Sequence, residues 1–465
     1  MRALIAALSA AALFFALPAT AAAQTLIRDT EIELMLREYT NPLLVAAGLD
    51  PNDVGLYIIG DQEINAFVTG GQNIFVNTGT IMESETPLQI KGVLAHEAGH
   101  ISGAHLARMS EAAQGAMVPM FVSIGLGLLA AMAGEGGAAS ALIASGPQFG
   151  ALNFYTHTRA QESAADQAAL QYMTATGQSG EGLVEFFERF RYQEVFTPAR
   201  RYRYFLTHPL SSERIAALRA GVDRSPYHDA AVPPEDQAQL ERIQAKIFGF
   251  MARPGQVFAR YPESDTSLPA RYARAVAYYQ DARLDRARAE IESLIAEEPE
   301  NPFFYELYGQ MLFESGHADE AISYHQRSVD LLPTAPLLRV NLAMAMVAVE
   351  DPQYLEAARD HLRVALDIEA DNAFAWYNLS LIHERMGNTA LAQLAIAEQA
   401  YATGNRMRAF QFATRAMQDL EPGTTPRFRA AELIAVAQPS EEEMRDLQRQ
   451  QRQQQREQQR REQGY

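Results

Sequence analysis

The stretch His96-Glu97-Ala98-Gly99-His100 decides how this chain folds and what chemistry it can perform. On a helix, residues four apart share a face, so the two imidazoles can reach one metal ion. Zinc accepts imidazole nitrogens in tetrahedral geometry and lowers the pKa of a bound water to about 7, and Glu97 can then take the proton from that water. The stretch therefore predicts one zinc ion per chain, with His96 and His100 as ligands and Glu97 as the catalytic base. The alternative is a chance match on a surface helix.

A third zinc ligand must come from elsewhere in the chain. One class of zinc peptidases has a histidine six residues after the second motif histidine, but Leu106 stands there and His105 is one residue short. The other source is a glutamate on a later helix, and Glu162 and Asp166 lie four residues apart on one face. We expect Glu162 to bind the zinc and Asp166 to orient a ligating imidazole. The alternative for Glu162 is an acid on the surface, and the alternative for Asp166 is an ordinary solvated carboxylate. We interpret His105, on the first helix, as supporting the site without binding the metal.

The composition excludes several other functions. The chain has 465 residues, which predicts two to four domains, and 48% of them are hydrophobic and 21% charged, as in ordinary globular proteins. The formal net charge of -18 disfavours nucleic acid as a partner, because acidic surfaces repel phosphates. The absence of cysteine excludes disulfides, thiol nucleophiles and thiolate metal sites.

The first 23 residues have the features of a signal peptide. Arg2 precedes an apolar run over residues 3–17, Pro18 interrupts it, and small residues before Gln24 suit cleavage near Ala23. The run is shorter than the ~20 residues of a comfortable membrane span, so an uncleaved anchor is the weaker alternative. We expect the mature protein in a bacterial periplasm.

The catalytic half is predicted to be a zinc metalloprotease domain over residues 24–225 with a small β-sheet. Short alternating segments predict strands, and apolar residues at helical spacing predict helices. Ser211 and Ser212 before the last of these helices are typical N-caps. The predicted strands are 54–59, 64–69 and 73–77. The predicted helices are 29–47, 86–109, one that starts near 158 with more helix after it to about 204, and 211–220. A linker and a connecting helix follow over residues 226–268.

Residues 112–134 form an uncharged run that is long enough to span a membrane. Pro119, Gly125 and Gly127 interrupt this run, and Glu135 turns it back. Three interpretations of 112–145 stay open: a membrane hairpin, a segment lying on the membrane or over the active-site groove, and a hairpin packed in the core.

The last part of the chain has a repeat. Pro299 and Pro333 lie 34 residues apart, which is the tetratricopeptide period. We therefore predict an α-solenoid of tetratricopeptide repeats over residues 269–437, with 406–420 and 426–437 as its cap; a nonrepetitive bundle is the alternative. Small or apolar residues recur at equivalent positions: Ala275, Tyr278, Ala287; Gly309, Leu312, Ala321; Ala343, Met346, Ala358, Ala365; Trp376, Leu379, Ser380, Ala392. The polar tail over 438–465 is predicted to be disordered or a lone solvated helix.

Three motifs together carry a family resemblance. The chain has HEAGH with a histidine five residues later, then Glu162 and Asp166 on a helix, then THPLSSER over 207–214. These resemble metallopeptidase family forty-eight, which includes the CAAX prenyl protease and the bacterial heat-shock membrane protease, and most of all its periplasmic members with tetratricopeptide repeats. The resemblance implies a mainly α architecture with a gluzincin-type α+β protease domain. It also implies zinc-dependent endopeptidase activity in quality control of misassembled outer-membrane or envelope proteins.

The same resemblance implies roles for further residues. His208 would occupy the open position of the zinc and hold the enzyme inactive, and Arg214 matches the arginine that follows it, as a contact to substrate or transition state. The alternative for His208 is a loop histidine that caps a helix or lines the cleft. Residues Asn65, Ala66 and Phe67 would form an edge strand that binds substrate; a plain core strand is the alternative.

Two rival functions remain open at this point. One is a chaperone or scaffold with a latent protease site, and the other is a membrane-embedded protease. In the favoured interpretation, the repeats bind unfolded or misassembled protein substrates, or dock the enzyme on the β-barrel assembly machinery.

Overall fold

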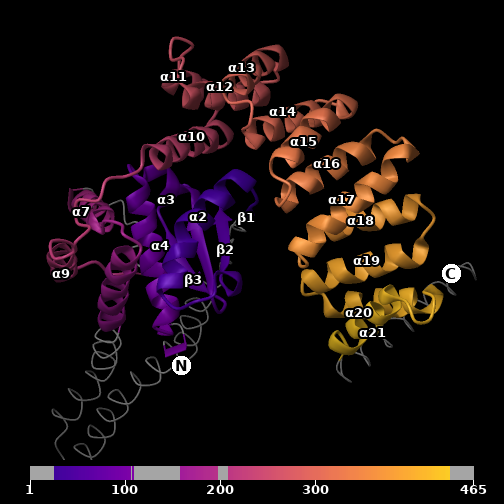
Figure 1. Cartoon of the computed structure of the whole chain (residues 1–465), viewed down its shortest axis with the longest axis horizontal. Coiled ribbons are helices and arrows are strands. Elements are labelled where there is room, and N and C mark those ends of the chain that lie inside the picture. Colours follow the sequence, from indigo (N-terminus) through magenta and orange to yellow (C-terminus); the bar gives the residue numbers. More distant parts are fainter. Residues whose placement is uncertain (1–25, 106, 109–157, 197–207, 440–465) are drawn as a thin grey trace, which may run out of the picture. The chain divides into compact units, whose positions relative to one another are not determined.

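The computed structural model describes residues 26–105, 107–108, 158–196 and 208–439 (Figure 1). The chain divides into two compact units. The first holds residues 32–247 and the segment up to residue 28, and the second holds residues 29–31 and all residues from 248 onward. The predicted signal peptide, the apolar stretch at 112–145 and nearly all of the polar tail lie outside the described residues. The domain limits drawn from the sequence stay predictions.

A four-stranded sheet lies in the first unit. Its strands are β1 (Leu26–Ile27), β2 (Gly55–Ile59), β3 (Ala66–Thr69) and β4 (Asn73–Asn77), in the order β1-β2-β4-β3. β2 runs parallel to β4, and the other pairs are antiparallel. Gly70 and Gly71 between β3 and β4 have positive φ angles of 61° and 101°, which glycine adopts without strain. The three predicted strands are confirmed; the first two begin one and two residues later than predicted, and the third has the predicted limits. The two-residue β1 was not predicted, because it is too short to show alternation.

Helices make up most of the rest of this unit. Their bounds are α2 (Thr30–Ala46), α3 (Thr78–Glu83), α4 (Pro87–Ser102), an unlabelled helix over 158–175, α7 (Glu181–Phe196), α9 (Ser212–Val222) and α10 (Pro234–Met251), with a 3₁₀ turn η1 at Pro51–Asp53. Ser211 caps α9 as predicted, because its side chain accepts a hydrogen bond from the Arg214 backbone N–H. Helix α4 packs against β3 and α7.

One predicted helix limit is wrong. The helix expected over 86–109 ends at Ser102, and Gly103 and Ala104 form a turn. Ala104 has a φ of 50°, in the left-handed region that side chains disfavour. His105 therefore follows a turn and does not continue the helix, which changes where its ring can reach.

The second unit is a succession of antiparallel helix pairs, drawn from rose to yellow in Figure 1. After α11 (Pro254–Arg260), the pairs are α12 (Leu268–Gln280) with α13 (Leu284–Glu297), α14 (Pro302–Glu314) with α15 (Ala318–Leu331), α16 (Pro336–Ala348) with α17 (Leu355–Ile368), α18 (Ala373–Arg385) with α19 (Thr389–Ala402), and α20 (Arg406–Asp419) with α21 (Thr425–Val436). The α-solenoid predicted from the 34-residue period is confirmed.

The repeat positions explain why these helices pair. Of the residues aligned from the sequence, all but Trp376 and the two prolines are buried, Gly309 included. Between α16 and α17 the chain forms a 3₁₀ turn, η2 (Pro352–Tyr354), which follows Glu350 with its φ of 60°. Each pair buries its apolar face on the next, as solenoids do. None of the helices in the described parts of the chain is long and apolar enough to cross a membrane.

Candidate metal centre

Helix α4 carries the motif into the interior of the first unit. His96 and Glu97 have no exposed surface, and His100 is 8% exposed. Gly99 makes the packing possible, because a Cβ built on it would lie 2.9 Å from the Ala165 carbonyl oxygen of the 158–175 helix. The glycine inside HEAGH thus lets the two helices approach closely enough for Glu162 to reach the imidazoles.

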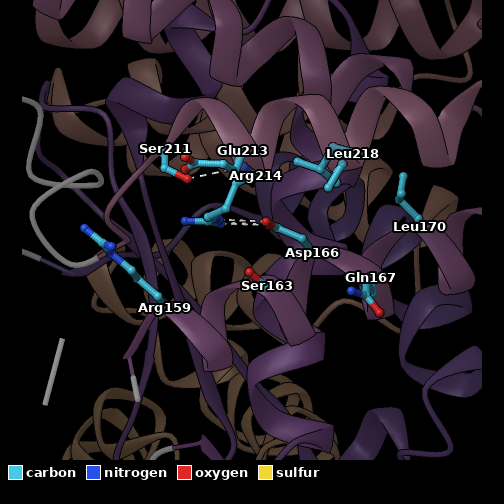
Figure 2. A pocket seen from close by; sticks show the side chains of 10 residues that line it. Arg159, Ser163, Asp166, Gln167, Leu170, Ser211, Glu213, Arg214 and Leu218 are labelled. Carbon is cyan, nitrogen blue, oxygen red and sulfur yellow. Dashed lines mark hydrogen bonds and ion pairs between the residues drawn. The ribbon is translucent and has the colours of Figure 1, made fainter. Parts of the chain in front are cut away.

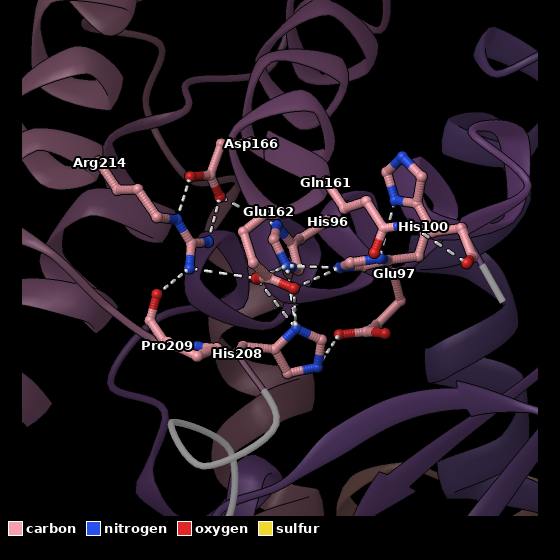
Figure 3. Close-up of polar contacts among 10 residues, drawn as sticks. His96, Glu97, His100, Gln161, Glu162, Asp166, His208, Pro209 and Arg214 are labelled. Atoms are coloured by element: carbon pink, nitrogen blue, oxygen red, sulfur yellow. Dashed lines mark hydrogen bonds and ion pairs between the residues drawn. The ribbon is translucent and has the colours of Figure 1, made fainter. Parts of the chain in front are cut away.

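Four side chains from three parts of the chain converge there, as Figure 3 shows. The His96 Nε2 atom lies 3.1 Å from His100 Nε2, 3.4 Å from His208 Nδ1 and 3.4 Å from Glu162 Oε2. Glu162 Oε1 lies 3.4 Å from His100 Nε2, and both Glu162 oxygens lie 3.2 Å from His208 Nδ1. One ligand atom from each residue lies within 4.8 Å of all the others. The structure thus brings together His96, His100, Glu162 and His208, all four of the residues expected around the metal.

These separations fit a zinc ion. In a tetrahedral site with ligand atoms about 2.0–2.1 Å from the metal, neighbouring ligand atoms lie about 3.3–3.4 Å apart. Five of the six pairs among the four residues have separations of 3.1 to 3.4 Å, and the ligand atoms of all six pairs lie within 4.8 Å. Three imidazoles, which bind metals in their neutral form, and one carboxylate are also ligands that zinc commonly takes in proteins. The donor set therefore matches zinc in both spacing and chemistry.

A second layer of polar residues holds these side chains in place. Asp166 Oδ1 lies 3.0 Å from His96 Nδ1, on the side of the ring away from the other ligand atoms. Arg214 donates to both Asp166 oxygens at 2.7 Å and lies 3.1 Å from Glu162 Oε2. It also donates to the Pro209 carbonyl at 2.7 Å. A single buried guanidinium thus fixes two carboxylates and the residue after His208.

His105 supports His100 from behind. Its Nδ1 lies 3.0 Å from His100 Nδ1, so the turn at Ala104 directs this ring back onto α4. Gly103 leaves room for it, since a Cβ there would lie 2.4 Å from His105 Nε2. The contact lies opposite the Nε2 atom of His100 that faces the other ligands, so His105 can fix the orientation of that imidazole.

Glu97 is poised differently from the other residues. Within the described part of the chain, neither of its carboxylate oxygens has a hydrogen-bond partner, although the side chain is fully buried. Burial raises the pKa of this carboxyl group, because the charged form loses its hydration. His208 Nε2 lies 3.6 Å from Glu97 Oε1. A buried carboxylate with open acceptors beside a metal-ligand cluster suits proton transfer to and from water or substrate.

The electrostatics favour a positive charge at the centre of the cluster. Burial alone would lower the pKa of His96, but hydrogen bonds to Asp166 and Glu162 raise it to about 9. Burial opposes ionisation of Glu162, yet its bonds to His208 and His96 hold its pKa well below the usual range. The pKa of His100 is lowered by burial and then by the neighbouring His96. A divalent cation can supply the same positive charge without protons.

A pocket adjoins the second layer of polar residues (Figure 2). The Asp166–Arg214 pair lines it, and it lies between the 158–175 helix and α9. The other lining residues are Arg159, Ser163, Gln167, Leu170, Ser211, Glu213, Ala217 and Leu218. None of the four ligand residues lines this pocket. The Asp166–Arg214 ion pair lines the pocket on one side and contacts His96 and Glu162 of the metal centre on the other.

The residues predicted to bind substrate lie at the edge of the sheet. Asn65 precedes β3, and its backbone is engaged by the Thr80 hydroxyl, which accepts from Asn65 N–H at 2.9 Å and donates to its carbonyl at 2.7 Å. The Ala66 side chain is buried, whereas Phe67 is partly exposed and stacks on Phe75. Their contact with substrate would therefore use the strand backbone and the Phe67 ring.

Sequence reasoning missed one aromatic residue of the site. Phe187 on α7 is fully buried, with its ring 6.1 Å from that of His96 in an edge-on arrangement. The Arg214 guanidinium carbon lies 5.5 Å from the Phe187 ring centre. The sequence around Phe187 predicted a helix, but nothing in it linked this residue to the histidines.

Comparison with known proteins is consistent with this geometry. Residues 31–222 match the family described as Peptidase family M48. The chain is 28% identical to the putative beta-barrel assembly-enhancing protease of Vibrio cholerae over 85% of this chain and 82% of that protein. It is 26% identical to the beta-barrel assembly-enhancing protease of Escherichia coli K12 over 80% of this chain and 77% of that one. Among solved structures, the crystal structure of MamA aligns with 37% of this chain and 96% of its own at 22% identity, with a TM-score of 0.28.

Proposed function

The chain carries a peptidase family M48 domain and is a zinc metallopeptidase, and from this premise we propose that it is a periplasmic endopeptidase for misassembled envelope proteins. The observation that carries the proposal is the convergence of His96, His100, Glu162 and His208 at separations that suit one tetrahedral zinc ion. A zinc ion held there would polarise the scissile carbonyl and make the attacking water more acidic.

The residues of the chain perform the remaining steps. Glu97 takes a proton from the attacking water and passes it to the leaving amine, as its open carboxylate oxygens and burial allow. Asp166 Oδ1 lies 3.0 Å from His96 Nδ1, where its negative charge keeps the ring proton on Nδ1, so that the Nε2 lone pair would be free to bind a metal. Arg214 keeps Asp166 and Glu162 in place. A direct contact between Arg214 and substrate would require it to release the Pro209 carbonyl.

His208 holds this site in a closed form. Its Nδ1 lies among the ligand atoms, where it would be a fourth protein ligand to a zinc ion and leave no position for water, and its Nε2 faces Glu97. We propose that the enzyme is latent while His208 stays there and active once its loop moves away. The Arg214 bond to Pro209 would stabilise the closed form.

The clients and the location follow from the relatives. Two similar proteins are named for enhancing β-barrel assembly, which favours outer-membrane proteins as substrates. The signal-peptide features of residues 1–23 favour export to the periplasm. The helix pairs of the second unit offer a surface for clients, or for docking on the β-barrel assembly machinery.

Metal analysis and casein cleavage test the proposal on the full chain. Wild type, Glu97→Gln and His208→Ala should each hold one zinc ion. Glu97→Gln should cleave about 10²–10⁴ times more slowly, because a general base typically contributes that much. His208→Ala should cleave faster than wild type. The exposed Glu235→Gln substitution is the matched control and should change nothing.

Three results would contradict parts of this proposal. Persistent cleavage by Glu97→Gln would mean that the base is misassigned. If His208→Ala cleaves no faster than wild type, the proposal that His208 holds the enzyme in a closed form is wrong. Zinc-loaded His208→Ala that cleaves no unfolded protein at all would favour a chaperone or scaffold over a peptidase.

A further inference from the structure

Three aromatic side chains form a row across the sheet. Tyr57 on β2 lies directly beside Phe75 on β4, and Phe75 lies directly opposite Phe67 on β3. The ring centres of Tyr57 and Phe75 are 5.0 Å apart with 21° between the planes, and those of Phe75 and Phe67 are 5.3 Å apart with 11°. The row, here called the aromatic ladder, therefore runs from β2 to the β3 edge in one stacked register.

The ladder lies on the less buried face of the sheet. Tyr57, Phe67 and Phe75 are each partly exposed. The neighbouring residues that point to the opposite face are buried: Ile58, Ala66, Val68, Ile74 and Val76. Alternation along a strand places these two sets on opposite faces. The ladder is thus a set of large apolar rings that the core does not cover.

The ladder ends at an open strand edge. Among the described residues, no strand pairs with β3 on the side away from β4. Asn77 N–H donates to the Asn65 carbonyl, so the Asn65 carbonyl points toward β4. Backbone direction alternates along a strand, which turns the N–H and C=O of Ala66 and Val68 outward. An added strand can therefore pair with these two residues.

We propose that the open end of the aromatic ladder at Phe67 is a side-chain subsite that selects an aromatic residue in the substrate. This inference rests on the proposed peptidase function and on substrate pairing with β3. A strand added at the usual spacing of about 4.7–4.9 Å places its residue opposite Phe67 at the same interval as the rungs of the ladder. In an antiparallel arrangement that position is a non-hydrogen-bonded pair, with Cα atoms only about 4.5 Å apart.

The chemistry of the substrate follows from the ladder. The rings of Tyr57, Phe75 and Phe67 stack nearly parallel, and a fourth aromatic ring continues the stack. A serine in the same position would leave the Phe67 ring facing water. Strands of outer-membrane β-barrels alternate in polarity and carry girdles of aromatic residues, so unfolded segments of such proteins supply this pattern.

A peptide scan on the full-length, zinc-loaded protein tests the subsite. Each fluorogenic ten-residue peptide has a single Phe that moves through a Ser/Thr/Ala background, and mass spectrometry locates the cleaved bond. Wild type should cleave at a fixed offset from the Phe and show a KM about 3- to 10-fold lower for that register than for the Phe-free peptide. Phe67→Ala should abolish both preferences, and Phe67→Tyr should restore them.

A matched control separates the subsite from its surroundings. Tyr57→Ala removes the ring at the other end of the ladder and should keep the cleavage offset. Wild type that cleaves the peptides with no offset would overturn the inference and leave the peptidase function intact. Wild type and His208→Ala that both fail to cleave any peptide would instead overturn the proposed function. A KM that rises equally for all peptides in Phe67→Ala would mean that Phe67 only supports the strand, and the subsite would be refuted.

Discussion

Both units of the molecule bury histidines, and the pKa values of His96 in the catalytic unit and His325 in the repeat unit shift in opposite directions. In the catalytic unit His96 faces two carboxylates, which raise its pKa to about 9. In the repeat unit His325 on α15 is 2% exposed, and burial lowers its pKa to about 4. One ring therefore sits where a positive charge is stabilised, and the other sits where it is not.

This difference teaches how to recognise a metal centre among buried histidines. Burial of an imidazole is common to both units and does not distinguish them. What distinguishes the catalytic unit is the set of carboxylates within 3.4 Å of the ring, supplied by Glu162 and Asp166 from another helix. His325 packs instead against Gly309, whose missing side chain makes room for the ring. A cation-binding function follows from the neighbours of a histidine and not from its burial.

Removal of the metal should have the largest effect and should be confined to one unit. A chelator should abolish peptidase activity and destabilise the catalytic unit by about 4 kcal/mol, if free zinc was a thousandfold above its dissociation constant. Hydrogen exchange over α4 should then accelerate. The chain has a single tryptophan, Trp376 on α18, so tryptophan fluorescence follows the unfolding of the repeat unit. The urea midpoint measured in this way should not move when the metal is removed.

The control for this experiment is zinc added back. Both the exchange rates over α4 and the activity should return to their starting values. If the chelator shifts the urea midpoint that is measured by Trp376 fluorescence, the two units unfold together. The prediction that the metal stabilises the catalytic unit alone would then be wrong.

The sequence predicted much of the metal centre because its spacing is local. His96 and His100 are one turn apart on a helix, and Glu162 and Asp166 are one turn apart on another, so each pair is visible without a structure. What the sequence lacks is the closeness of the two helices, which depends on Gly99 packing on Ala165.

The parts that escaped prediction depend on backbone turns and on contacts across the fold. The end of α4 at Ser102 was missed because residues 103–108 have no proline and no strong helix breaker beyond Gly103. The aromatic ladder was also invisible, since the register of β2, β4 and β3 decides which rings meet. The repeat unit, by contrast, was predicted in outline, because each helix pair contacts mainly its neighbours in sequence.

Acidification should destabilise the repeat unit through its buried histidine, His325, by less than metal removal destabilises the catalytic unit. The unfolded chain binds a proton at His325 near pH 6.5, whereas the folded chain resists it down to about pH 4. The contribution to stability is therefore complete above about pH 6.5 and is lost as the pH falls toward 4, by roughly 3 kcal/mol in all. Urea unfolding followed through Trp376 at several pH values measures this slope.

Two variants tell whether His325 causes the slope. His325→Leu should flatten the pH dependence between pH 6.5 and 4, even if its stability at neutral pH is lower. His317→Leu changes a partly exposed histidine at the start of the same helix and should keep the wild-type slope. Equal slopes in all three proteins would assign the acid sensitivity to other groups.

The smallest expected effect concerns the space that Gly309 leaves for His325. A Cβ on Gly309 would lie 2.8 Å from the His325 ring, so Gly309→Ala should destabilise the repeat unit by about 1–3 kcal/mol through overpacking. Gly255→Ala on α11 is the matched control, because a Cβ there meets nothing within 4 Å and alanine favours helix. The double variant Gly309→Ala with His325→Ala should recover part of the loss, since the clash is then gone. If Gly309→Ala is as stable as Gly255→Ala, the ring of His325 is not confined, and the low pKa must come from a source other than close packing.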